Sequence, residues 1–104
     1  DQEGGRVQRL RAPYWHEWEP PLDSIAAAGS VEAAAALMRA RATVIAAELR
    51  AVGIDANCAP LADVARPGTH AFLRNRCYGT DPASVARIAR AVAQGLVAGG
   101  VLPV

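Results

Sequence analysis

Apolar side chains recur at helical spacing between Val31 and Val52, as they do on one face of a helix. Ser30 stands where a helix N-cap is expected, and Gly53 stands where glycine commonly ends a helix. The pattern therefore predicts a helix over 31–52 with one buried apolar face and with charged residues mostly elsewhere. The expected apolar face carries Leu37, Met38, Val44, Ile45, Leu49 and Val52, and the charged residues are Arg39, Arg41, Glu48 and Arg50.

A second apolar stripe predicts another helix near the end of the chain. Asp81 can cap its first turn, and Pro82 suits the first helical position because proline lacks the N–H that would be unpaired there. The pair Gly99-Gly100 is expected to end the helix. Its predicted apolar face carries Val85, Ile88, Ala89, Val92, Leu96 and Val97.

Two short apolar segments follow these helices. Ile54–Leu61 comes directly after the first helix and predicts a buried strand, and 101–104 predicts the start of another. Residues 12–30 and 65–79, which are rich in proline and glycine, predict long loops. Strands that alternate with helices favour parallel pairing and the α/β fold class. Because no strand precedes the first loop and no helix follows 101–104, we expect a longer domain than these 104 residues.

Composition and charge exclude several classes of protein. Apolar residues make up 52% of the chain, which is too many for a disordered segment. The net charge of +1 gives no electrostatic support for nucleic-acid binding, and no apolar run approaches the roughly 20 residues of a membrane helix. Cys58 and Cys77 fit no metal spacing and are expected as reduced interior thiols, and neither His16 nor His70 has a suitably spaced partner, so no metal site is expected.

Four segments in a fixed order resemble a known enzyme family. DQEGGRVQRLR, ELRAVGIDANCAPLADV, LRNRCYGTDP and GVLPV follow one another as in the N-terminal domain of glycoside hydrolase family 3, and are most similar to its bacterial β-N-acetylhexosaminidases. The resemblance implies that residues 1–104 are a fragment of that catalytic barrel. The expected fold is a partial (β/α)8 TIM barrel with about two β/α units plus strand ends.

The resemblance also implies which residues bind substrate. Asp1, Arg9 and Arg76 match positions that bind the sugar in the family, and Asp63 is a further candidate because it follows the predicted strand. Active sites of such barrels lie at the C-terminal ends of the strands, so we expect these side chains at one end of a parallel strand pair. Glu3 is interpreted as a scaffold residue, because the family does not use it as a catalytic acid.

Each candidate has a simpler interpretation. Arg76 could pair with Asp81 at the start of the following helix, and Arg9 could be a solvated loop charge. Asp63 could cap a loop rather than bind a ligand, and Asp1, at the end of the chain, could be disordered. The segment 73–78 also departs from the family pattern, since Cys77 replaces a serine and Leu73-Arg74 replaces Ile-Gly.

The family's catalytic residues have no counterpart here. The Lys-His-Phe-Pro-Gly-His-Gly stretch, the His-Asp acid/base pair and the aspartate nucleophile are all missing, so no catalytic residue is expected in this chain. The intact enzyme is expected to be cytoplasmic and to cleave terminal β-linked N-acetylglucosamine from peptidoglycan-derived muropeptides with retention, without a cofactor. Its expected partner is a carbohydrate, and neither nucleic acid nor a membrane. The alternatives are a β-glucosidase of the same family and a non-catalytic α/β binding module.

Overall fold

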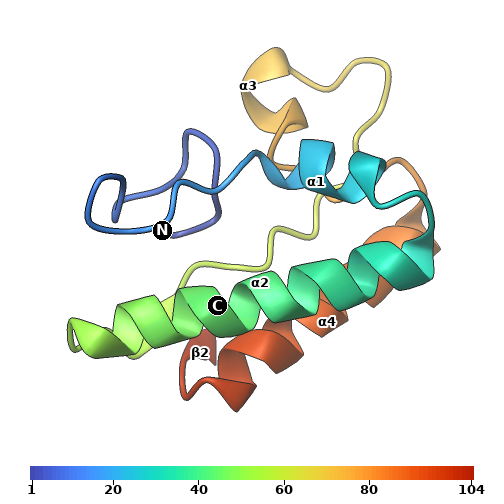
Figure 1. Ribbon diagram of the computed structural model, residues 1–104. Helices are drawn as coiled ribbons and strands as arrows, with labels where there is room; N and C mark the ends of the chain where they lie inside the picture. Colours follow the sequence, from blue (N-terminus) through green and yellow to red (C-terminus); the bar gives the residue numbers. More distant parts are fainter.

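The computed structural model describes residues 1–104 as helices and short strands joined by long loops (Figure 1). In chain order the elements are α1 (Pro21–Ala27), α2 (Val31–Ala51), β1 (Ala56–Asn57), α3 (Ala71–Arg74), α4 (Pro82–Ala98) and β2 (Leu102–Pro103). No helix combines the length and the apolar character of a membrane-spanning segment.

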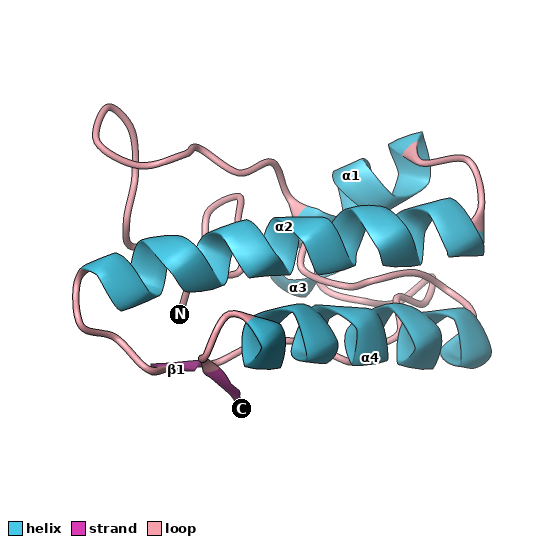
Figure 2. Cartoon of the chain, turned by 60° about the horizontal axis from the view of Figure 1, so that its bottom comes forward, coloured by secondary structure: helices cyan, strands magenta, loops and turns pink.

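The two long helices lie side by side and enclose most of the core (Figure 2). Both begin as expected, because Ser30 accepts a hydrogen bond from the Ala33 N–H and Asp81 accepts one from the Ser84 N–H. The two helices approach closely at Gly95 of α4, where an added Cβ would lie 2.4 Å from the Arg39 carbonyl oxygen of α2. Their shared core contains Ala34, Met38, Ala42, Ile45, Ala46 and Leu49 from α2, and Val85, Ile88, Ala89, Val92 and Leu96 from α4.

The buried face of α2 matches the expected one at Met38, Ile45 and Leu49 and differs from it elsewhere. Leu37, Val44 and Val52 are 45%, 48% and 46% exposed, whereas Arg41, expected elsewhere, is only 6% exposed. The buried stripe also contains Ala34, Ala42 and Ala46, because small residues allow the two helix backbones to approach closely. On α4 the expected face is confirmed except for Val97, which is exposed.

The strands are parallel, as expected, but much shorter than predicted. Only Ala56 and Asn57 pair with β2, in the register Ala56 to Leu102 and Asn57 to Pro103. The segment is also not uniformly buried, since Ile54 is 38% exposed and Cys58 is exposed, although both were expected inside. A strand is buried on both faces only when elements cover both, and here the helices cover one.

Two short helices interrupt the predicted loops. Helix α1 lies inside 12–30 and starts with Pro21 in its first turn, where proline is well tolerated. Helix α3 lies inside 65–79, and the His70 ring nitrogen accepts a hydrogen bond from the Phe72 N–H at its start. Both are shorter than the window over which helical periodicity can be recognised in a sequence.

The open sheet leads to a stability prediction. Isolated residues 1–104 are expected to aggregate or to fold only partly, because β1 and β2 have free edges and Leu102 and Val104 are 63% and 71% exposed. Size-exclusion chromatography and a thermal scan of the isolated segment test this. A monomer with a sharp, reversible transition would contradict it.

Candidate functional site

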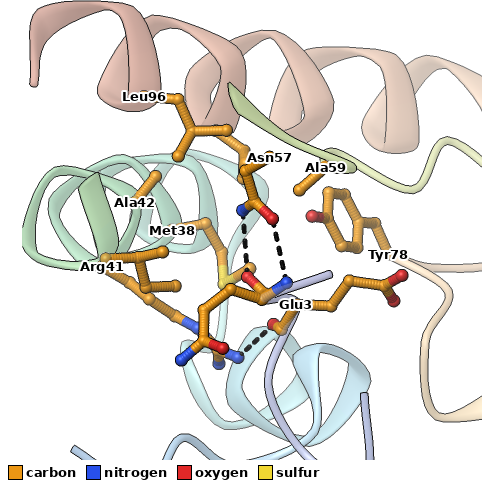
Figure 3. A pocket seen from close by; sticks show the side chains of 11 residues that line it. Glu3, Met38, Arg41, Ala42, Asn57, Ala59, Tyr78 and Leu96 are labelled. Carbon is orange, nitrogen blue, oxygen red and sulfur yellow. Dashed lines mark hydrogen bonds between the residues drawn. The ribbon is translucent and has the colours of Figure 1, made fainter. Parts of the chain in front are cut away.

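Two amides tie the N-terminal segment to β1. The Gln2 N–H donates to Asn57 Oδ1 at 2.9 Å, and Asn57 Nδ2 donates to the Gln2 carbonyl at 3.1 Å (Figure 3). Both residues are almost fully buried. This reciprocal pair places Asp1 beside the strand without a regular sheet ladder.

The Gln2 side chain also holds the segment that returns past it. Its Oε1 accepts from the backbone N–H groups of Arg9 and Leu10 at 2.8 and 3.1 Å, and its Nε2 donates to the Leu10 carbonyl. The backbone of Arg9 is therefore fixed, and its Nη2 reaches Asp1 Oδ2 at 3.3 Å. The Arg9 side chain is 74% exposed, so most of its guanidinium is accessible to a ligand.

Arg76 forms a second ion pair, with Glu3. Its Nε and Nη2 donate to the two carboxylate oxygens at 2.9 and 2.8 Å. The Glu3 side chain is 4% exposed and the Arg76 side chain 22%. The hydrogen bonds that Arg76 donates to the Glu3 carboxylate raise the pKa of Arg76 more than any other contact does. The interpretation of Glu3 as a scaffold residue agrees with this geometry.

The alternative partner of Arg76 is wrong. The Asp81 carboxylate caps α4 and accepts from both the N–H and the hydroxyl of Ser84, which lowers its pKa. Asp63 makes no hydrogen bond, so it does not cap a loop, but its charge acts on Arg76 and helps to raise the pKa of that arginine. The structure thus pairs Asp1 with Arg9 and places Asp63 close enough to act on Arg76. No hydrogen bond joins the Asp1–Arg9 pair to Asp63 or Arg76.

Arg41 braces this region from α2. Its Nη2 donates to the Glu3 carbonyl at 2.7 Å (Figure 3). The same Nη2 donates to the Glu19 carbonyl at 2.8 Å, and Nη1 donates to the Ser24 hydroxyl. Burial lowers its pKa, and the nearby Glu19 carboxylate opposes that shift. Figure 3 shows the Glu3 carboxylate directed away from Arg41, so the backbone and the side chain of Glu3 serve different arginines.

Two hollows border these residues. The cavity between Arg41, Asn57 and Tyr78 has a volume of only about 10 Å³, which is too small for a sugar. Burial raises the pKa of Tyr78 to about 12, so this phenol stays neutral. A larger hollow of about 170 Å³ is lined by Arg76, Asn75, Gly4 and other residues.

The sequence did not identify three of these residues as part of the site. Gln2 and Asn57 gave a weak signal, because each is polar in a segment expected to be close-packed, and buried polar groups need partners. Arg41 gave none, because a helical arginine is ordinarily solvated.

Comparisons with known proteins identify the family. The family described as "Glycosyl hydrolase family 3 N terminal domain" matches residues 1–104. A Beta-hexosaminidase of Xanthomonas campestris pv. campestris is 45% identical over 102 residues, which cover 96% of this chain and 30% of that protein. The chain therefore spans less than a third of the length of this relative.

Solved structures agree in fold. NagZ from Neisseria gonorrhoeae in complex with N-trifluoroacetyl-D-glucosamine has a TM-score of 0.88 and 33% identity, over 99% of this chain and 30% of that one. The Beta-N-acetylhexosaminidase from Beutenbergia cavernae has a TM-score of 0.81 and 38% identity, again over 99% and 30%. On this sequence and structural evidence, the chain belongs to glycosyl hydrolase family 3, within its N-terminal domain.

Proposed function

We propose that this chain is part of a retaining β-N-acetylhexosaminidase. The proposal depends above all on the 45% identity, across 96% of the chain, with a relative named Beta-hexosaminidase. A structural neighbour that holds N-trifluoroacetyl-D-glucosamine supports an N-acetylglucosamine substrate. The resemblance further leads us to propose peptidoglycan-derived muropeptides as the natural substrate and the cytoplasm as the compartment.

The proposed fold of the whole domain is a (β/α)8 TIM barrel. In it, β1 and β2 are neighbouring barrel strands, and α2 and α4 are the helices that precede them on the outer surface. The parallel pairing of β1 with β2 and the contact of α4 with β2 support this assignment. Residues 1–104 would then contribute about two of the eight β/α units.

In the proposed site, Asp1, Arg9, Arg76 and Asp63 bind the sugar. A carboxylate accepts from two adjacent hydroxyls, and Asp1 has Oδ1 free for this because only Oδ2 contacts Arg9. Arg9 and Arg76 donate to sugar oxygens from rigid planar groups. The nucleophile and the acid/base of the two-step displacement are supplied by residues outside 1–104.

The function is tested by chromophore release from two glycosides. The full-length protein is expected to hydrolyse an aryl N-acetyl-β-glucosaminide and to prefer it strongly over the aryl β-glucoside. Isolated residues 1–104 are expected to release nothing, because binding groups without a nucleophile cannot form the glycosyl-enzyme. Preference for the glucoside would instead identify a β-glucosidase, and hydrolysis by the segment alone would contradict the assignment of the catalytic groups.

A further inference from the structure

The Arg76–Glu3 pair fixes the plane of the guanidinium. Two parallel hydrogen bonds, at 2.9 and 2.8 Å, use Nε and one N–H of Nη2. Such a two-point contact sets both position and orientation, whereas a single hydrogen bond leaves rotation free. Nη1 makes no hydrogen bond within the chain, so its two N–H groups remain available to a ligand.

Glu3 is itself held on both sides of its Cα. Its N–H donates to the Val7 carbonyl at 2.8 Å, and its own carbonyl accepts from Arg41 Nη2 at 2.7 Å. Gly4 follows with a φ of +104°, and a Cβ there would lie 1.8 Å from Arg41 Nη2. The backbone of Glu3 therefore cannot shift easily, and its buried carboxylate is a fixed reference point for Arg76.

Arg76 needs such a reference because its own segment is irregular. It lies just after α3, a helix of 4 residues, and its long side chain has many rotamers when it is unpaired. Asp63 lies near enough to act on its charge but forms no hydrogen bond with it. Glu3 is thus the sole side chain in residues 1–104 that determines where the guanidinium points.

We propose that Glu3 is a positioning residue that aims Nη1 of Arg76 at the bound sugar. The inference rests on the proposed function, in which Arg76 binds substrate. Arg41 supports the same arrangement from α2 by holding the Glu3 backbone. Glu3 does not touch the substrate and acts only through Arg76.

A double-mutant cycle in the full-length protein tests the proposal. Glu3→Gln keeps the shape of the side chain but removes one of the two acceptors, so Arg76 loses its two-point contact. A misplacement of about 1 Å can cost roughly 100-fold in rate, so kcat/KM is expected to fall about 10- to 100-fold. The loss of kcat/KM in Glu3→Gln should be split between kcat and KM in the same proportion as in Arg76→Ala. In the double mutant, Glu3→Gln should cause no loss beyond that of Arg76→Ala alone.

The control is Glu32→Gln. It breaks an exposed ion pair in which Arg87 Nη1 lies 2.7 Å from Glu32 Oε1, so activity should not change. If Arg76→Ala lowers activity and Glu3→Gln does not, or if their losses multiply in the double mutant, the positioning role is wrong and the proposed function stands. If Arg76→Ala is fully active, the proposed sugar-binding role of Arg76 fails, and the inference fails with it.

A second variant decides the matter if Glu3→Gln does not fold. Glu3→Asp keeps the charge but withdraws the oxygens by one methylene, so it preserves an ion pair while moving Arg76. A folded Glu3→Asp protein with an unchanged thermal midpoint and reduced kcat/KM supports positioning. Full activity of that variant overturns it, because a merely structural ion pair tolerates the shorter side chain.

Discussion

Replacing Arg76 with alanine in the full-length enzyme is expected to lower kcat/KM for an aryl N-acetyl-β-glucosaminide roughly 30- to 1,000-fold. The substitution removes the proposed charge-assisted contact with the sugar, and such a loss costs about 2–4 kcal/mol of transition-state stabilisation. It also leaves the Glu3 carboxylate, which is 4% exposed, without its partner. Steady-state kinetics with a chromogenic substrate give the ratio, and the thermal midpoint shows whether the variant stays folded.

Arg74→Ala is the matched control for this experiment. Arg74 lies two residues away, is exposed and forms no side-chain hydrogen bond or ion pair, so its removal should not change kcat/KM. Equal activity of Arg76→Ala, Arg74→Ala and the wild type would remove Arg76 from the proposed site.

Gly95→Val is expected to give the largest loss of stability. A Cβ at Gly95 would lie 2.4 Å from the Arg39 carbonyl oxygen and 2.8 Å from the Ala42 Cβ, so the two long helices would have to move apart. Overpacking of this kind costs about 1–3 kcal/mol and sometimes more. The better helix propensity of valine offsets only a few tenths of a kcal/mol. Denaturant unfolding of the full-length protein measures the change.

Gly68→Val provides the comparison. Gly68 lies in a loop, its φ is not positive, and no atom lies within 4 Å of the Cβ that would be added. Its unfolding free energy is expected to stay within about 0.5 kcal/mol of the wild type. Equal stability of the two variants would show that α2 and α4 do not pack as closely at Gly95 as the structure indicates.

The local chemistry of the long helices could be predicted from the sequence. The caps at Ser30 and Asp81, the stops at Gly53 and Gly99 and most of the α4 face depend on residues only a few positions apart, which act before any tertiary contact forms. The same short-range order made the DQEGGRV and LRNRCYG segments recognisable as those of a glycoside hydrolase. The positions of Asp1, Arg9, Arg76 and Asp63 as sugar-binding residues remain predictions.

Contacts between distant segments could not be predicted in this way. Residues 1–104 by themselves determined the two helices, their order with the strands and the family, because these follow from periodicity, capping and motif spacing. Only the tertiary structure decided that Arg41 is buried, that Gln2 pairs with Asn57, and that Glu3 rather than Asp81 holds Arg76. These partners are 38 to 73 positions apart in the sequence. Which partner a buried charge pairs with depends on the geometry of the folded chain and on the cost of removing the charge from water, and neither periodicity nor motif spacing contains that information.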